Sequence, residues 1–429
     1  MKLQTLKIPI TLLLIMILCS TTNGYNILGL FTIPIASHYY FAETLLKNLA
    51  SKGHNVTVVS YFPQKTPLEN FTDISIKGPD MKNFIDLSIF EPKHFHSSLE
   101  EFHRIQDWGL KDCEAAFQSD AIAKILTMKH EFDVILVEEF NNDCILAITH
   151  LLDAPVVSLS SCWLMPWLYD RMQTPYFVSF WPPNNCGTGE KMNFLERVKC
   201  FLYHHYSIFW FQTVTKFKTN TIVRKYLGDS IPDVDEIARK RTVLMLINQH
   251  FSLTGVKAYA PTVIEVGGLQ IEQAKTLNPK MKQILDASKN GVIYVNWGSM
   301  VRKSSIPASK REELVKAFGR LKQTVIWKWE NETLPNQPKN VHIMKWTQQR
   351  EILSHPNVKV FMSHGGLLGT SEATYYGVPI IATPIFGDQF LNSKTLAERG
   401  MGLTLLFDDL TEENIYNSIQ TALKSEFQQ

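Results

Sequence analysis

The sequence lacks an excess of either charge. Its 43 lysines and arginines are balanced by 41 aspartates and glutamates, so the formal net charge is only +2 over 429 residues. It also lacks a run of like charges that would suit a polyelectrolyte. A nucleic acid is therefore not expected as a partner, while the sequence gives no indication of an oligomeric state.

Beyond residue 24, the sequence lacks a hydrophobic stretch long enough to cross a bilayer. Residues 1–24 contain two lysines, an apolar core from Ile8 to Cys19, and small residues at Thr22 and Gly24 before Tyr25. This pattern is typical of a cleaved secretory signal peptide, since an uncleaved anchor needs a longer apolar run. We therefore expect a product of the secretory pathway, in the endoplasmic reticulum lumen or secreted, without a C-terminal membrane anchor in this chain.

Cysteines are few and scattered. Six occur, and five remain if Cys19 leaves with the signal peptide. They show neither metal-binding spacing nor a dense disulfide framework, so we expect buried free thiols with room for one disulfide. Three Asn-X-Thr triplets begin at Asn55, Asn70 and Asn331 and agree with secretory entry, although Asn55 begins a predicted strand.

What is present is an ordinary globular composition, 45% hydrophobic and 20% charged, in a chain long enough for about two domains. The pattern of residues 25–60 indicates a strand, a helix and a second strand joined by a right-handed parallel crossover. From GVIYVNWGS (residues 291–299) onward, strand and helix patterns alternate again. The sequence predicts an α/β fold with two Rossmann-like parallel-sheet domains, at residues 25–251 and 263–429, joined by a linker at 252–262.

Residues 345–403 carry the strongest functional signal. VKVFM (residues 358–362) is typical of a buried parallel strand, and a turn containing Gly365 and Gly366 follows it. Glycines let the backbone approach a ligand, and the helix start beyond them presents free N–H groups and a partial positive charge. A diphosphate fits this turn, although the turn alone is a weak signal because many αβ units carry glycine for packing.

Residues on both sides of this turn suit the rest of a nucleotide sugar. Trp346 offers a flat ring to a base, and Gln349 offers an amide to a base edge or a ribose. Asp388 and Gln389 supply the acceptors and donors that sugar hydroxyls require. Together these residues predict a nucleotide-sugar site.

The order and spacing of W-x-x-Q, HP, S-H-G-G, Glu372, G-V-P and D-Q, over about 44 residues, resemble the signature of the UDP-glycosyltransferases. The resemblance implies a GT-B fold, in which two parallel-sheet domains face each other across a cleft, the second holding a UDP-sugar and the first an acceptor. Neither a metal nor another cofactor is implied. The implied donor contacts are uracil on Trp346, base and ribose on Gln349 and Glu372, diphosphate on Ser299, His364, Gly366, Gly369 and Thr370, and sugar on Asp388 and Gln389.

Two positions in or beside this set, Leu368 and Ser299, do not point to donor binding alone. Leu368 departs from the family pattern, because an asparagine that helps to hold the donor often stands there. Ser299 is also explained by a purely structural role in the turn that follows the predicted strand.

His38 lies in the loop after the first predicted strand, at a helix start. A lone histidine there is more often a surface or capping residue, but ligands of parallel sheets sit beyond the carboxyl ends of strands. The resemblance implies that His38 is the general base that takes the proton of an acceptor hydroxyl. Its supporting carboxylate is either Glu138 or Asp143, both just past the predicted strand VILV, and either acid is also explained as the start of a helix.

The resemblance implies inverting transfer of a hexose, glucose favoured over glucuronate, from a UDP-sugar to a hydroxyl of a small lipophilic acceptor, as in detoxification. Aromatic residues within 62–129 and 162–183 suit the walls of an acceptor pocket, and a metal at His94 and His96 is disfavoured. The amphipathic stretch 193–226 suits either a membrane surface or a buried helix pair. Related animal enzymes continue beyond the position of Gln429, so a non-catalytic binder of UDP-sugars or lipophilic ligands is an alternative, as is a transferase that uses another nucleotide.

Overall fold

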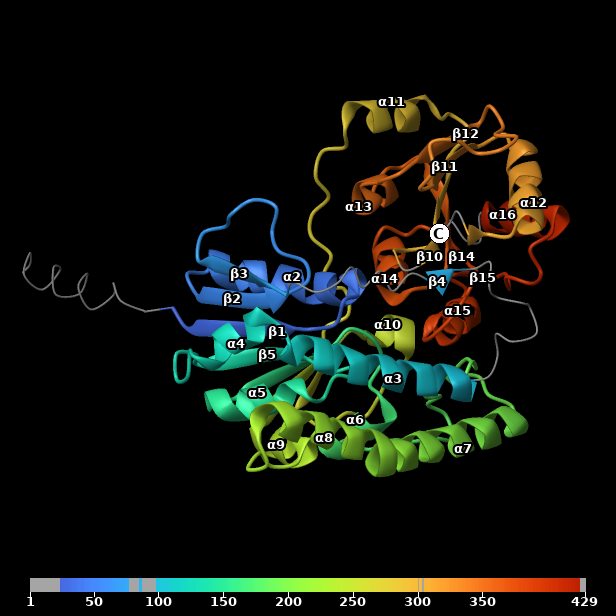
Figure 1. Ribbon diagram of the computed structural model, residues 1–429. Coiled ribbons are helices and arrows are strands. Elements are labelled where there is room, and N and C mark those ends of the chain that lie inside the picture. The colour runs from blue at the N-terminus through green and yellow to red at the C-terminus, as the bar shows by residue number, and fades with distance from the viewer. Residues whose placement is uncertain (1–23, 77–84, 87–97, 300, 303–304, 425–429) are drawn as a thin grey trace, which may run out of the picture.

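The computed structural model describes residues 24–76, 85–86, 98–299, 301–302 and 305–424. The predicted signal peptide, apart from Gly24, therefore lies outside the described residues, as do His94 and His96. Two parallel sheets with helices on their faces make up the described chain, one in each half, which confirms the predicted fold class (Figure 1).

The first half forms a seven-stranded parallel sheet with the order β3-β2-β1-β5-β6-β7-β8. Its strands are short apolar runs because both faces of the sheet are covered. In β1, Leu28 and Leu30 pack in one apolar cluster while Ile27 and Phe31 pack in another on the opposite face. The strands are β1 (Asn26–Phe31), β2 (Asn55–Ser60), β3 (Phe71–Ser75), β5 (Val134–Glu138), β6 (Val156–Ser160), β7 (Thr242–Ile247) and β8 (Val263–Glu265).

The helices of the first half connect these strands and cover the sheet (Figure 1). They are α2 (Ala36–Ser51), α3 (Ser98–Phe117), α4 (Asp120–Leu126), α5 (Ile145–Leu152), α6 (Pro166–Arg171), α7 (Phe194–Trp210), α8 (Lys216–Leu227), α9 (Val234–Arg241) and α10 (Phe251–Thr254). A π-helical turn at Phe211–Thr215 joins α7 to α8.

The second half forms a six-stranded parallel sheet with the order β12-β11-β9-β13-β14-β15. Its centre, β9, is buried along its whole length, with Ile293 and Val295 on one face and Val292 and Tyr294 on the other. The strands are β9 (Val292–Asn296), β11 (Thr324–Lys328), β12 (Val341–Met344), β13 (Val358–Ser363), β14 (Ile380–Ala382) and β15 (Gly402–Thr404). The helices are α11 (Pro279–Ala287), α12 (Ala308–Gly319), α13 (Gln349–Leu353), α14 (Leu367–Tyr375), α15 (Gln389–Glu398) and α16 (Glu412–Ala422).

The two halves are in direct contact. A short parallel ladder pairs β4 (Ile85–Asp86) with β10 (Val301–Arg302), and α10 packs against α15. In Figure 1, α3, α10, α14 and α15 lie where the two halves meet. The carboxylate of Glu398 in α15 also accepts hydrogen bonds from the backbone N–H groups of Glu190 and Lys191.

Two expectations from the sequence are corrected. The predicted second domain begins at residue 263, but β8 pairs with β7 in the first sheet, so the division between the sheets comes after Glu265. The expectation of free thiols with room for one disulfide is also wrong, because the described cysteines form two disulfides and leave Cys162 free and buried. The disulfides join Cys113 to Cys144 and Cys186 to Cys200.

The amphipathic stretch 193–226 forms α7, the π-helical turn and most of α8. Cys200 and Tyr203 on α7 are buried, but Phe194 and Leu195 are 69% and 74% exposed. The alternative of a buried helix pair is therefore wrong for the start of α7, while contact with a membrane surface stays a prediction. No helix in the described part of the chain is both long and apolar enough to span a bilayer.

Candidate active site

A cavity of about 690 Å³ opens between the two halves, where the carboxyl ends of both sheets meet. The first half contributes His38, Glu101 and Arg104 to its walls, and the second half contributes Trp346 and Asp388. The other sequence-predicted residues that line it are Ser299, Gln349, His364, Gly366, Gly369, Glu372 and Gln389. The volume is within the range of small-molecule sites.

The base end of the cavity is built around an exposed indole. Trp346 follows β12 and is 71% exposed, so its ring can be covered by a ligand. The Lys328 ammonium lies 5.3 Å from the centroid of that ring. A flat exposed ring beside a cation suits stacking with a heterocyclic base.

Gln349, at the first position of α13, is held by hydrogen bonds on both sides of its amide. Its Oε1 accepts from Asn296 Nδ2 at 2.6 Å, and its Nε2 donates to Glu372 Oε2, also at 2.6 Å. Burial raises the pKa of Glu372 while the bond from Gln349 opposes that rise. The pair presents fixed polar groups at the cavity wall, as recognition of a base edge or a ribose requires.

The glycine turn after β13 holds His364 in place. Gly298 has φ +74°, and a Cβ atom there would lie 2.7 Å from the His364 ring. A Cβ atom on Gly366 would lie 2.5 Å from Nε2 of the same ring. Both positions therefore need glycine for His364 to keep its place beside the start of α14.

The N-terminal end of α14 faces the cavity. Gly366 is its N-cap, and Leu367, Leu368 and Gly369 in its first turn line the wall. The unpaired backbone N–H groups and the positive end of the helix dipole favour an anionic group there. Thr370, in the same turn, is buried and does not line the cavity. Its hydroxyl has no hydrogen-bond partner among the described residues.

The loop before α15 carries the acid and the amide that were predicted to bind a sugar. Gln389 Oε1 accepts from the backbone N–H groups of Ile385 and Phe386 at 2.9 and 3.2 Å, which fixes the orientation of its amide. Asp388 Oδ2 accepts from Asn392 Nδ2 at 3.0 Å. Burial raises the pKa of Asp388, and both the Asn392 bond and the charge of His38 oppose that rise.

On the other side of the cavity, His38 in the first turn of α2 meets Glu138 at the end of β5, with 2.7 Å between Nδ1 and Oε1. The ring of Phe140 packs edge-on against the imidazole, 4.9 Å between centroids. Burial alone would lower the pKa of His38, but the charge of Glu138 and its hydrogen bond raise it above its ordinary value. The arrangement leaves Nε2 of the imidazole to accept a proton.

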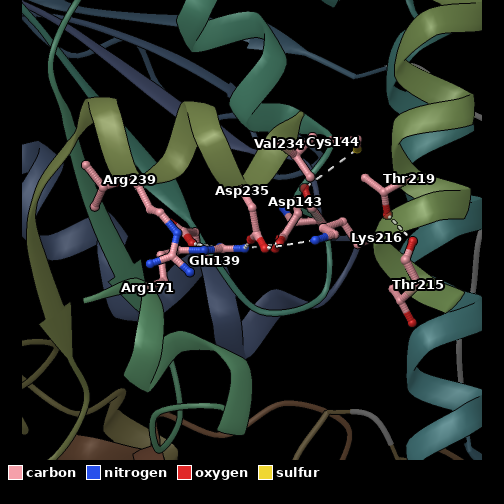
Figure 2. Close-up of polar contacts among 12 residues, drawn as sticks. Glu139, Asp143, Cys144, Arg171, Thr215, Lys216, Thr219, Val234, Asp235 and Arg239 are labelled. Atoms are coloured by element: carbon pink, nitrogen blue, oxygen red, sulfur yellow. Dashed lines mark hydrogen bonds and ion pairs between the residues drawn. The ribbon is translucent and has the colours of Figure 1, made fainter. Parts of the chain in front are cut away.

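Asp143, the alternative support for His38, contacts a different residue. Arg171 Nη2 donates to Asp143 Oδ2 and, at 2.7 Å, to Asp235 Oδ1, while Nη1 donates to Glu139 (Figure 2). Burial raises the pKa of Asp143 to about 6, with the Arg171 charge opposing the rise. The geometry thus favours Glu138 over Asp143, whose carboxylate neutralises a buried guanidinium.

Sequence reasoning missed several residues at the site. Asn296 orients Gln349 and is the last residue of the apolar strand β9. A polar residue at the end of an apolar strand is the sequence signal that could have identified it. Asp112 in α3 lies close enough to His38 for the two charges to interact, and burial raises the pKa of Asp112 to about 7. Glu101 lies in a region with no recognisable motif, and only the fold brings it to the cavity.

No group of three or more metal-ligating side chains that could hold an ion occurs among the described residues. The expectation that the reaction needs no metal or other cofactor stays a prediction, because this observation does not test it.

Comparisons with known proteins bear on the family of this chain. Residues 30–429 match the family described as "UDP-glucoronosyl and UDP-glucosyl transferase". The chain is 35% identical to UDP-glucosyltransferase 2 of Dactylopius coccus, over 96% of this chain and 80% of that protein. It is 25% identical to human UDP-glucuronosyltransferase 1A9, over 94% of this chain and 77% of that protein.

Solved structures show the same fold at low sequence identity. The calicheamicin glycosyltransferase CalG4 aligns with a TM-score of 0.59 and 16% identity, over 95% of this chain and 92% of that one. The spinosyn forosaminyltransferase SpnP aligns with a TM-score of 0.62 and 16% identity, over 94% of this chain and 92% of that one. These neighbours are GT-B glycosyltransferases, in agreement with the two facing sheets and the cavity between them. The chain therefore belongs to the UDP-glucuronosyl and UDP-glucosyl transferase family and is a glycosyltransferase.

Proposed function

We propose that the protein transfers a hexose, with glucose preferred to glucuronate, from a UDP-sugar to a hydroxyl group of a small lipophilic acceptor. The observation that carries the proposal is the His38–Glu138 pair, in which the acid is buried behind His38 and His38 lines the same cavity as Asp388 and the start of α14. A base and a donor site on opposite walls of one cleft provide what a direct displacement at the anomeric carbon requires.

In the proposed reaction, His38 Nε2 takes the proton of the acceptor hydroxyl as its oxygen bonds to the anomeric carbon. The bond from that carbon to the phosphate oxygen breaks, and UDP leaves from the opposite face, so that the configuration inverts. Glu138 holds the imidazole through Nδ1 and stabilises the imidazolium that forms. The N-terminal end of α14 stabilises the charge that develops on the leaving diphosphate.

Two observations support glucose over glucuronate. Glu101 and Asp388 both line the cavity beside the loop that was predicted to bind the sugar, and their charges are close enough to interact. Arg104 on the same wall offsets one of these two charges, so a carboxylate on the sugar would still meet a net negative charge from the three residues, whereas a neutral hydroxymethyl group would not be repelled. The relative at 35% identity is named a UDP-glucosyltransferase.

The proposed acceptor class is supported by the wall next to His38. Tyr40, Trp108, Phe140 and Met165 line the cavity on the first half. Large apolar and aromatic walls suit a phenol or another lipophilic alcohol, of the kind conjugated in detoxification.

The secretory location is supported by the two disulfides, which form and persist in oxidising compartments. In the second half, the glycosylation candidate Asn331 is exposed and lies outside the strands.

A mass shift after endoglycosidase treatment of the protein made in insect cells would support entry into the secretory pathway. If the mass did not change and both Asn70 and Asn331 were unmodified, the result would count against that location.

The test of the activity uses purified protein with labelled UDP-glucose, UDP-glucuronate and a panel of phenols. His38→Gln should lower turnover by about 10²–10⁴ while leaving UDP binding intact. His205→Gln, a change at an exposed histidine on α7 away from the cavity, is the matched control and should keep full activity. Binding of UDP without turnover in the wild type would favour a non-catalytic binder, and no binding of UDP would contradict both functions.

A further inference from the structure

The loop that carries Asp388 belongs to the second half but is held by side chains of the first half. Glu101 on α3 accepts a hydrogen bond from the backbone N–H of Gly387 through Oε1. This contact crosses the cleft, and Glu101 and Gly387 both line the cavity. A carboxylate is a strong acceptor for a backbone N–H, so the contact fixes the start of the loop.

A second contact reaches the same loop through Asn392, one turn into α15. Asn392 Nδ2 donates to Asp388 Oδ2 at 3.0 Å and to the carbonyl oxygen of Gly365 at 3.1 Å. Its Oδ1 accepts from the indole N–H of Trp163, in the first half, at 3.0 Å. Asn392 therefore joins the sugar loop, the glycine turn and the first half.

The indole N–H and the Gly365 carbonyl oxygen fix the same orientation of this amide from opposite ends. An indole N–H can only donate, so Asn392 must turn its carbonyl oxygen toward Trp163 and its NH₂ group toward Asp388. Trp163 is 3% exposed and packs against Leu367 and Leu391, which keeps the indole in place. Without the indole N–H, Asn392 Oδ1 loses its hydrogen-bond partner, and the amide is held only by the bonds that its NH₂ group donates.

We propose that Glu101 and Trp163 are positioning residues for the donor sugar: the first half, besides binding the acceptor, sets the loop that binds the sugar of the donor. The proposal rests on the proposed function, since it assumes a UDP-sugar donor. It assigns the two residues no direct contact with the reacting atoms. They act through the Gly387 backbone and through the Asp388 carboxylate.

A selective effect follows, because the groups expected to bind UDP itself belong to the second half. Trp346 and the Gln349–Glu372 pair have no hydrogen bond to Glu101 or to the Trp163 indole N–H in the described chain. The glycine turn is reached only through Asn392 Nδ2, which can still donate to the Gly365 carbonyl oxygen when the indole N–H is removed. Loss of the cross-cleft bonds should therefore weaken the binding of UDP-glucose and leave the binding of UDP unchanged. General damage to the fold would weaken both ligands together.

The experiment measures the dissociation constants of UDP and UDP-glucose by calorimetry for wild type and variants. Trp163→Phe keeps most of the ring but removes the N–H, and it should weaken UDP-glucose binding about tenfold with UDP binding within about twofold. Trp167→Phe is the matched control, because Trp167 is equally buried in the same half and its indole N–H has no hydrogen-bond partner in the described chain. It should bind both ligands as the wild type does.

A second pair of variants tests the other contact without touching the core. Glu101→Ala removes the acceptor and should weaken UDP-glucose binding several-fold, while Glu101→Gln keeps a carbonyl oxygen for the Gly387 N–H and should restore most of the affinity. This pair answers the question even if Trp163→Phe does not fold. Equal losses for UDP and UDP-glucose, or unchanged UDP-glucose binding in both Trp163→Phe and Glu101→Ala, would overturn the proposal. A wild type that binds no UDP at all would instead contradict the proposed function itself.

Discussion

The side chains of His38, in the first turn of the helix that follows β1, and Glu138, at the end of β5, meet with 2.7 Å between Nδ1 and Oε1. β1, which leads into α2 and His38, pairs directly with β5, which ends at Glu138. The acid is 2% exposed and the ring is packed against Phe140, so neither side chain is free to turn away. The sheet register thus places the acid behind the imidazole and leaves its other nitrogen toward the cavity.

The first prediction concerns the pH dependence of transfer. Burial lowers the pKa of His38, but the charge and hydrogen bond of Glu138, together with the charges of Asp388 and Asp112, raise it above its ordinary value. Only the neutral imidazole can accept a proton, so kcat/KM should fall as the pH drops through this raised pKa. In Glu138→Gln the raising charge is gone, so the acid limb should move to lower pH, and turnover at its plateau should fall about 10–100-fold. Profiles of kcat/KM against pH for both proteins check this, and an unmoved acid limb would contradict it.

The second prediction separates Asp143 from Glu138. Asp143→Asn should lower stability but keep the acid limb of the wild-type profile, because Asp143 is bonded to Arg171 and not to His38 (Figure 2). Arg171→Met should be far more damaging, since it leaves Glu139, Asp143 and Asp235 without their buried counter-charge. The expected loss is about 3–5 kcal/mol in the free energy of unfolding, measured in urea.

An acid limb that moves in Asp143→Asn as it does in Glu138→Gln would mean that both acids support the base. Asp170→Asn is a suitable control, because its partner Arg239 lies in an exposed ion pair that contributes little. Its unfolding free energy should stay within about 1 kcal/mol of that of the wild type.

The elements were predictable because local apolar patterns determine them. VKVFM, expected as a buried strand, lies within β13, and the strand, helix and strand expected in residues 25–60 are β1, α2 and β2. The cavity also gathers His38 with most of the residues predicted for the donor. What the sequence did not reveal depends on contacts between distant segments.

Three examples show this limit. Cys113 and Cys144 are 31 residues apart, and only the packing of α3 against the start of α5 brings them together. β8 belongs to the first sheet because it pairs with β7, a choice that its three residues do not encode. Glu138 and Asp143 were indistinguishable in sequence, and the position of Arg171 on α6 separates them.

The third prediction concerns the base end of the site. Trp346→Ala should weaken UDP binding about tenfold or more, because stacking of an aromatic side chain on a base contributes about 1–3 kcal/mol. The indole is 71% exposed, so its removal should change the melting temperature little. Trp346→Phe keeps a flat ring and should retain most of the affinity. Titration with UDP and a thermal melt check both parts, and unchanged UDP binding in Trp346→Ala would exclude the stacking role.

The fourth prediction compares two glycines of one helix start. Gly366→Ala would place a methyl group 2.5 Å from His364 Nε2, which is too close for the ring to keep its position. Gly369→Ala meets its nearest neighbours, Gln349 Nε2 and Phe361, at 3.4 Å, which is close to ordinary contact, and it lies inside α14.

Because alanine favours a helix over glycine by about 1 kcal/mol, Gly369→Ala should raise the melting temperature slightly and keep UDP binding within a few-fold. Gly366→Ala should displace His364 from the start of α14 and lower UDP affinity by about tenfold or more, with the rest of the fold intact. Calorimetric titration with UDP, beside a thermal melt of each variant, measures both effects. If the two variants bound UDP equally well, the packing of His364 between Gly298 and Gly366 would have no part in holding the diphosphate.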